Sequence, residues 1–379
     1  MKRSGWMVLV LMVAVSAWAA SKKMTVAQLE DLLASQHQAG KSDADVAAEL
    51  QNVELTEELT HSTMNSMSPE VPGQLTTEQL YVLEIRSAVL PAPATDISTA
   101  AAPDAAAQKA MLDKAMDYAA KTYAQLPAMS ATKVTRRFQD NPQPGKDTFA
   151  AKNNATLSVQ GTAIRYTASA ETPVSLHGGV ENAPAKEKTN WGDNGMIAME
   201  GQPPALNAVL QEAQAAGKIN WVRWEMVNGM QTAVYSFSVD KKKSHYAVSY
   251  CCFPETSQAG NIAMRGTETA GGAGNYMNNA NWKNWKGTEP YHGEIFVDPK
   301  TGVVVRLDLQ AELKGSDPVR VEKQRIDYGE VKVGDKAVIV PVQTLIDTLE
   351  QPYPDSPTGR FVFRHTLFAE DYKDYQAGS

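Results

Sequence analysis

The chain has 379 residues, of which 36 are Lys or Arg and 43 are Asp or Glu, giving a net charge of −7. Its 43% of hydrophobic and 21% of charged residues exclude a chain that is disordered throughout. Two cysteines exclude a disulfide-dense scaffold and a multi-cysteine zinc ribbon. The negative charge makes the surface a poor electrostatic partner for nucleic acid, so we expect no nucleic-acid partner.

Residues 1–19 have the pattern of a secretory signal peptide. A basic start at Met1–Arg3 precedes an apolar run at Met7–Val15, and Ala17 and Ala19 place small residues at both cleavage-determining positions. The run is short for a membrane span, and two lysines follow soon after it, which disfavours the alternative of an uncleaved anchor. We therefore expect this segment to be removed.

Cleavage changes both the charge and the compartment that we expect. Loss of Lys2 and Arg3 leaves 34 basic residues against 43 acidic residues, a net charge of −9. No later segment of the sequence is long enough and apolar enough for a membrane helix. The sequence thus predicts an acidic protein that is periplasmic or secreted, and that is not an integral membrane protein after signal cleavage.

Residues 20–90 are predicted to form a helical module. Ser42, Thr56 and Thr76 each stand just before acidic residues, as helix N-caps do. Apolar residues recur at helical spacing in two stripes, which are Leu29, Leu32 and Leu33, and then Val46, Ala47 and Leu50. The following residues, 91–105, are rich in Ala, Pro, Ser and Thr, a composition typical of a linker or of an ordered connector.

Residues 106–379 are predicted to form one antiparallel β domain. A helix is expected over about 105–125, and a second helix begins after Pro203-Pro204 and ends at Gly217. The remaining apolar residues mostly alternate with polar ones, as they do in strands. The segment 254–290 is rich in Gly, Asn and Thr and breaks this alternation, so we expect a flexible loop there.

The clearest strands flank Asn228-Gly229, a strong signal for a two-residue hairpin turn. This turn pairs Trp224 with Ala233 and Val222 with Tyr235, and it gathers large apolar side chains on one face. A third strand over 245–253 is expected to extend that face. The resulting aromatic face consists of Trp224, Tyr235, Phe237, Tyr246 and Tyr250.

The predicted fold class is α+β, with an N-terminal helical module followed by a large curved antiparallel sheet, a half-barrel, on which one or two helices pack. Further strands are expected over 319–328, 331–333, 336–342 and 360–368. The aromatic face has two interpretations: it is either ordinary core, as large apolar residues on a sheet usually are, or the lining of a ligand-binding hollow.

Three short motifs resemble those of penicillin-recognising enzymes: Ser130-Ala131-Thr132-Lys133, Tyr276-Met277-Asn278 and Lys300-Thr301-Gly302. In such an enzyme the first motif opens a buried helix, so that serine and lysine meet one turn apart. Here the motif leads into β-rich sequence that ends at Phe138. This context argues against a hydrolase of that type.

The sequence supplies no catalytic residue, no metal site and no cofactor site. His292 and Glu294 lie two apart on a predicted strand and share a face, but no Cys-x-x-Cys accompanies them. Cys251 and Cys252 are adjacent on a strand and point to opposite faces, which disfavours a disulfide between them.

Three groups of residues resemble a family of secreted bacterial proteins. They are Leu126-Pro127 with Thr132–Phe138; Trp221–Glu225 with Ser244–Tyr246 and Cys251-Cys252; and Tyr291–Glu294 with Asp298-Pro299 and Gly302. The plan of a helix and a long curved sheet with a helical lid, over about 105–345, is similar to the periplasmic lipoprotein carriers of the LolA and RseB type. The resemblance implies an open half-barrel whose concave face holds acyl chains or a partner protein.

The leading hypothesis is a non-enzymatic binding or carrier protein that holds an apolar ligand or a lipidated partner on the aromatic face. Burial of acyl methylenes, at about 0.8 kcal/mol each, would drive such binding. The alternatives are an envelope structural or interaction module without a small ligand, and a hydrolase of the penicillin-recognising type. The partners expected are a lipid, a lipoprotein or another envelope protein.

Overall fold

The computed structural model describes residues 21–140, 164–182, 198–202, 204–254, 282–350 and 364–378. The expected signal peptide and most of the expected flexible loop lie outside these residues. Among the residues that the structure describes, no helix is long and apolar enough to cross a bilayer.

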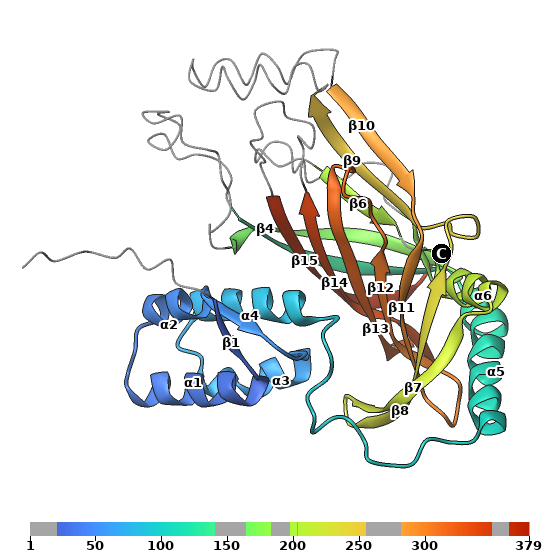
Figure 1. Cartoon of the computed structure of the whole chain (residues 1–379), viewed down its shortest axis with the longest axis horizontal. Coiled ribbons are helices and arrows are strands. Elements are labelled where there is room, and N and C mark those ends of the chain that lie inside the picture. Colours follow the sequence, from blue (N-terminus) through green and yellow to red (C-terminus); the bar gives the residue numbers. More distant parts are fainter. Residues whose placement is uncertain are drawn as a thin grey trace, which may run out of the picture.

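The centre of the protein is a large antiparallel sheet (Figure 1). Its ten strands are β3 (Met129–Asp140), β4 (Ile164–His177), β5 (Val180–Asn182), β7 (Ile219–Val227), β8 (Met230–Val239), β11 (Tyr291–Val297), β12 (Val304–Ala311), β13 (Val319–Val333), β14 (Lys336–Glu350) and β15 (Arg364–Ala377). They follow the order β5-β4-β3-β15-β14-β13-β12-β11-β8-β7. The sheet is not closed into a barrel, and the predicted α+β class is confirmed.

The longest strands are longer than the sequence predicts. β13 runs without a break through both predicted strands, 319–328 and 331–333, and β14 continues to Glu350. Gly334, with φ 62°, lies in the turn that joins β13 to β14. A register shift at Tyr328 accommodates the irregular alternation that made one strand look like two.

A second, three-stranded sheet consists of β6 (Ala198–Gln202), β9 (Ala247–Pro254) and β10 (Trp282–Thr288), in the order β10-β9-β6. The sequence analysis placed the strand over 245–253 directly after the Asn228-Gly229 hairpin in one sheet, and this placement is wrong. β8 pairs with β7 and β11 instead. β10 also occupies part of the expected loop over 254–290.

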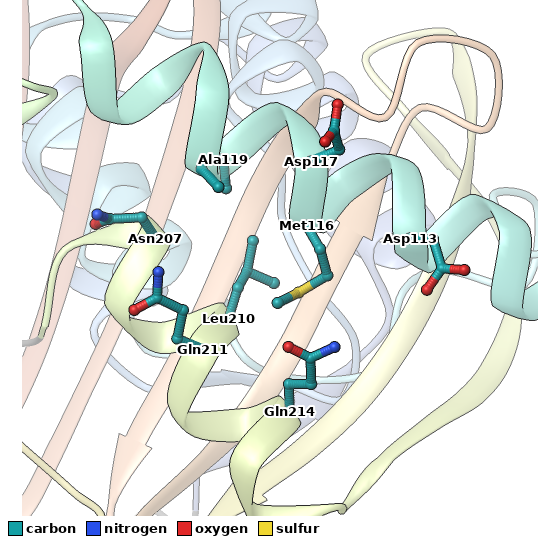
Figure 2. A pocket seen from close by; sticks show the side chains of 9 residues that line it. Asp113, Met116, Asp117, Ala119, Asn207, Leu210, Gln211 and Gln214 are labelled. Atoms are coloured by element: carbon teal, nitrogen blue, oxygen red, sulfur yellow. The ribbon is translucent and has the colours of Figure 1, made fainter.

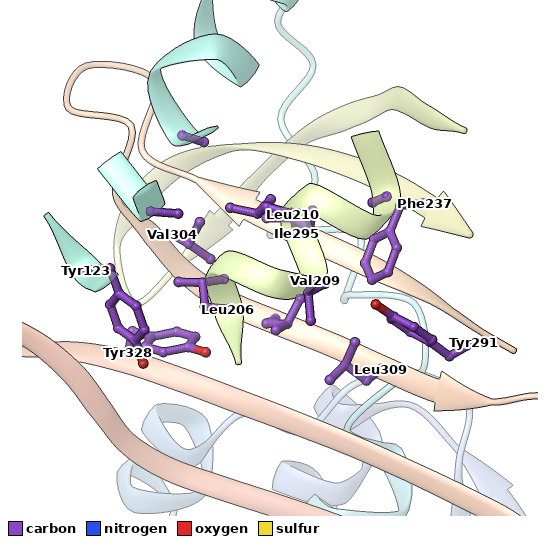
Figure 3. Close-up of a cluster of buried hydrophobic side chains, with 14 of the residues drawn as sticks. Tyr123, Leu206, Val209, Leu210, Phe237, Tyr291, Ile295, Val304, Leu309 and Tyr328 are labelled. Atoms are coloured by element: carbon purple, nitrogen blue, oxygen red, sulfur yellow. The ribbon is translucent and has the colours of Figure 1, made fainter. Parts of the chain in front are cut away.

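Two helices cover one face of the large sheet, which we call the helix face. They are α5 (Ala105–Lys121) and α6 (Leu206–Ala216), and Gly217 ends α6 with φ 68°, as the sequence predicts. α6 buries Leu206, Val209 and Leu210 at helical spacing because these residues share one side of the helix. Figure 3 shows these side chains lying over strand residues of the sheet.

The N-terminal helical module lies on the opposite side of the sheet (Figure 1). It contains α1 (Val26–Gln38), α2 (Asp43–Leu50), α3 (His61–Ser66) and α4 (Gln74–Ser87), with the short parallel strands β1 (Lys22–Met24) and β2 (Val53–Leu55). Ser42 caps α2 as predicted. The start predicted at Thr56 is wrong, because β2 extends to Leu55 and Thr60 caps α3.

The segment that the sequence suggests as a linker is ordered against the edge of the sheet. Met226 N donates to Asp96 O at 2.7 Å, and Ser98 N donates to Trp224 O at 3.2 Å. These bonds cover the outer edge of β7, which would otherwise expose unpaired backbone groups. The connector therefore also protects an edge strand.

The module packs on the second face of the sheet, which we call the module face. Val82 and Ile85 of α4 contact an apolar group that contains Phe138, Leu345 and Leu367. Beside this contact lies a buried ionic network.

Glu58 is the centre of that network. Arg306 Nη1 lies 2.6 Å from Glu58 Oε1, and Arg325 forms an ion pair with the same oxygen. Asp327 binds Arg306 Nε at 2.6 Å, and Asp308 binds Arg325 Nη2 at 2.7 Å. The two guanidinium groups are each 3% exposed, so the carboxylates replace the water that these groups lost on burial.

We predict that Glu58→Ala lowers the free energy of unfolding by about 3–5 kcal/mol, because it leaves two buried guanidinium groups short of one carboxylate. Urea denaturation measures this change. The matched control is Glu54→Ala, which removes a pair with Lys23 in which both side chains are exposed. This control should cost less than about 1 kcal/mol. Equal costs for the two variants would contradict a stabilising role for the network.

Candidate binding site on the helix face

The structure divides the predicted aromatic face between the two sheets: Trp224, Tyr235 and Phe237 lie on β7 and β8, Tyr250 lies on β9, and Tyr246 lies just before β9. Tyr235, Phe237, Tyr246 and Tyr250 are buried in the main core, and Trp224 packs against the same core while partly exposed. Side chains of α5 and α6 belong to that core as well. The residues of the aromatic face therefore belong to a packed core in this structure.

A bulge in β7 alters the predicted register. Trp224 pairs with Ala233 as predicted, but Tyr235 pairs with Trp221 rather than with Val222, because the register shifts between Trp221 and Arg223. The bulge turns Trp221 onto the helix face, where its ring contacts those of Trp224 and Tyr235 edge to face. It leaves Val222 40% exposed.

Hydrogen bonds connect each helix to residues of the sheet and its neighbouring loop. Tyr235 Oη donates to Gln108 O of α5 at 2.7 Å, and burial raises the pKa of this tyrosine to about 12. Glu212 of α6 accepts from Tyr291 Oη at 2.7 Å and contacts His245 Nδ1 at 2.7 Å. The helices thus rest on an apolar layer and are positioned by a few hydrogen bonds.

A cleft of about 320 Å³ opens between α5 and α6 (Figure 2). Met116, Ala119 and Leu210 contribute its apolar lining, while the polar lining residues are Asp113, Asp117, Asn207, Gln211 and Gln214. None of its nine lining residues carries a positive charge. Asp113 and Asp117 form exposed ion pairs with Lys109 and Lys121, one turn away on the same helix. The cleft therefore combines an apolar base with an acidic, amide-rich lining.

Beyond the helices, the helix face carries a row of buried polar side chains. Glu322, Thr348, Thr366 and Gln139 are direct cross-strand neighbours on β13, β14, β15 and β3. Each is at most 6% exposed. We call this set the polar row. Core positions of a sheet are ordinarily apolar, so a buried polar row beside an apolar layer is a feature that packing alone does not require.

Glu322 is the ionisable group of the polar row. Its carboxyl accepts from Tyr246 Oη and from Gln324 Nε2, the latter at 2.6 Å. Burial raises its pKa from 4.5 to about 7. Desolvation disfavours the carboxylate, and the two hydrogen bonds offset only part of that effect. A carboxyl with this pKa exchanges a proton near neutral pH.

The other residues singled out from the sequence do not meet in one site. Ser130 and Lys133 lie three apart on β3 and so point to opposite faces, which prevents the contact that a penicillin-recognising enzyme needs. His292 contacts Glu312, whereas Glu294 binds Arg223. The side chains of Cys251 and Cys252 lie outside the described residues. In the described ranges, no three His, Cys, Asp or Glu are placed to hold a metal ion.

The cleft and the polar row were not predicted from the sequence. Their residues are ordinary surface types on α5 and α6, or polar residues on strands that read as half-exposed. Only β13 carries a sequence pattern that could have indicated the polar row. Charged or amide residues occur there on both faces of the strand, at odd-numbered and at even-numbered positions. Comparison with protein-family models, with curated proteins and with solved structures found no match.

We predict that Glu322→Gln flattens the pH dependence of stability. The folded protein binds a proton at Glu322 more tightly than the unfolded chain does. Protonation of Glu322 therefore stabilises the fold fully below about pH 4.5, and this stabilisation is lost as the pH rises through about 7. Relative to the variant, the wild-type protein should lose about 3 kcal/mol of unfolding free energy across that interval.

Urea denaturation at a series of pH values measures the effect. Glu330→Gln, on an exposed position of the same strand, is the control and should follow the wild-type curve. Parallel curves for Glu322→Gln and the wild-type protein would show that the carboxyl titrates as in the unfolded chain.

Proposed function

We propose that the protein is an exported, non-enzymatic binding or carrier protein for an amphipathic ligand, which it takes up in the cleft between α5 and α6. The observation that carries the proposal is this cleft, which lies over the apolar layer of an open sheet. Its volume of about 320 Å³ lies at the lower end of the range for small-molecule sites.

The architecture supports the proposal beyond the cleft itself. An open antiparallel sheet covered by two helices can admit a ligand between its layers, because the helices are joined to the sheet by side-chain contacts rather than by a backbone ladder. The aromatic face supplies an apolar surface beneath them. The resemblance to lipoprotein carriers implies a ligand held on the concave face of the sheet, whereas the cleft proposed here lies between the two helices that cover the sheet.

The size of the cleft sets the affinity that we expect. About ten buried methylenes contribute roughly 8 kcal/mol before the costs of association, which corresponds to a dissociation constant no tighter than micromolar. Such an affinity suits a carrier, which must release its ligand as well as hold it.

The lining also favours a particular headgroup. Two carboxylates and three amides line the cleft, and none of the lining residues is basic. A cationic or uncharged hydrogen-bonding headgroup therefore matches the cleft better than a carboxylate or phosphate does.

We predict that Ala120→Trp weakens ligand binding at least tenfold, because the indole fills the cleft from an exposed lining position. Displacement of a fluorescent single-chain amphiphile measures this. Ala106→Trp, on an exposed position of α5 outside the cleft, is the matched control and should bind as the wild-type protein does. Equal affinities for the two variants, or mass spectra of purified protein without any extractable amphiphile, would contradict the proposal.

We also predict that dodecylamine binds roughly three- to tenfold more tightly than dodecanoate, since each exposed carboxylate contributes up to about 1 kcal/mol. The preference should fall in high salt and in the double variant Asp113→Asn, Asp117→Asn. Competition against one fluorescent probe measures both ligands. A preference for dodecanoate would show that the cleft does not select the headgroup.

A further inference from the structure

The interface between the helical module and the sheet contains one carboxyl that the ionic network does not neutralise. Glu84 lies on α4, its side chain is 1% exposed, and Oε1 contacts His61 Nδ1 at 3.1 Å. Its other oxygen, Oε2, is buried and has no hydrogen-bond partner among the described residues. A buried carboxylate with a single partner is costly, whereas a protonated carboxyl is much less so.

The groups that surround this pair add negative charge. Asp371 of β15 and Asp327 of β13 each raise the pKa of both Glu84 and His61 through their negative charge. Asp371 pairs with Arg136 of β3, and Asp327 pairs with Arg306 of β12. Gln343 of β14 contacts His61, and Tyr81 of α4 packs near its ring. No guanidinium group in these contacts pairs with Glu84.

The charges across the interface do not balance without extra protons. The carboxyl groups of the connected set belong to Glu58, Glu84, Asp308, Asp327 and Asp371, and its guanidinium groups to Arg136, Arg306 and Arg325. Five carboxylates face three guanidinium groups and one imidazole. A proton on His61 and a proton on Glu84 make the set neutral. The nearby residues Asp96, Glu225 and Arg223 add more negative charge than positive charge.

The position of His61 in its own helix works against a proton on its ring. His61 is the first residue of α3, where the partial positive charge of a helix N-terminus opposes a charged imidazole. The carboxyl of Glu84 nevertheless raises the pKa of His61, and burial raises the pKa of Glu84. Asp371 and Asp327 of the sheet also raise the pKa of both groups, so both bind protons more tightly when the module is docked than when it is released.

We propose that docking of the helical module on the sheet is coupled to proton uptake by the His61–Glu84 pair, so that the module is held at acidic to neutral pH and loosens as the pH rises. The direction is the same for both groups. A histidine and a glutamate that hold their protons more tightly in the docked state favour docking at low pH, and that contribution is lost as the pH rises through their docked-state pKa values. Release would uncover Phe138 and Leu367 on the module face.

Hydrogen exchange of the full chain tests the proposal. We expect exchange in α4 and in the part of β15 that α4 covers to rise about tenfold between about pH 6 and about pH 8.5, after correction for the intrinsic pH dependence of exchange. Peptides from β11, outside the module contact, serve as the internal reference. Constant corrected protection of α4 over this interval would overturn the proposal.

Two variants separate the coupled pair from general destabilisation. Glu84→Gln keeps the shape but removes the titrating carboxyl, so α4 should remain protected at about pH 8.5. His61→Gln removes one of the two proton-binding groups, so the loss of α4 protection between about pH 6 and about pH 8.5 should be smaller than in the wild-type protein. The control, His292→Gln, removes a pair in which both side chains are exposed and should keep the wild-type step. A full wild-type step in both interface variants would overturn the proposal.

Discussion

Both faces of the open sheet are covered in this protein, and the remaining features of the structure depend on how each face is covered. Successive residues of one strand point to opposite sides of the sheet. One stretch of sequence therefore has to pack against α5 and α6 on one side and against the helical module on the other. β12 illustrates the constraint, because Leu307 and Leu309 join the core under α5 and α6, whereas Arg306 and Asp308 join the ionic network under the helical module.

The contacts that hold α5 and α6 on the sheet differ in kind from those that hold the helical module. The two sets of contacts therefore restrict the placement of these elements to different degrees. Apolar contact between α6 and the sheet tolerates small shifts, since dispersion and burial are non-directional. The contact of Glu58 with two guanidinium groups is directional, and it permits only one placement of the module. Buried ion pairs often add little net stability, so the apolar group around Phe138 supplies most of the burial while the charges fix the orientation.

The difference between the two interfaces also accounts for the position of the cleft and of the buried carboxyl group. The helix layer rests on an apolar surface and meets the sheet through a few anchors such as Glu212 and Tyr235, which leaves a cleft between the helices. The module interface is densely charged and includes Glu84, a carboxyl that depends on a proton. The proposed ligand-binding role therefore belongs to the helix face, and the proposed response to pH belongs to the module face.

Features that depend on neighbours within a few residues could be predicted from the sequence alone. The N-cap at Ser42, the C-cap at Gly217 and the hairpin at Asn228-Gly229 follow from side chains that bond or bend the backbone locally. The α+β class and the apolar character of the aromatic face followed from hydrophobic periodicity. The same periodicity could not say whether that face is packed core or a hollow.

Features that depend on distant partners could not be predicted in this way and follow only from the assembled fold. Glu58 meets Arg306 across 248 positions of sequence, and no local pattern distinguishes either residue from an exposed charge. The bulge beside Val222, the assignment of β9 to a second sheet and the cleft between α5 and α6 likewise arise from packing between elements. Interactions between neighbouring residues set the backbone conformation and the alternation of side chains along a strand. The residues that each side chain contacts are set by the packing of elements that are distant in the sequence.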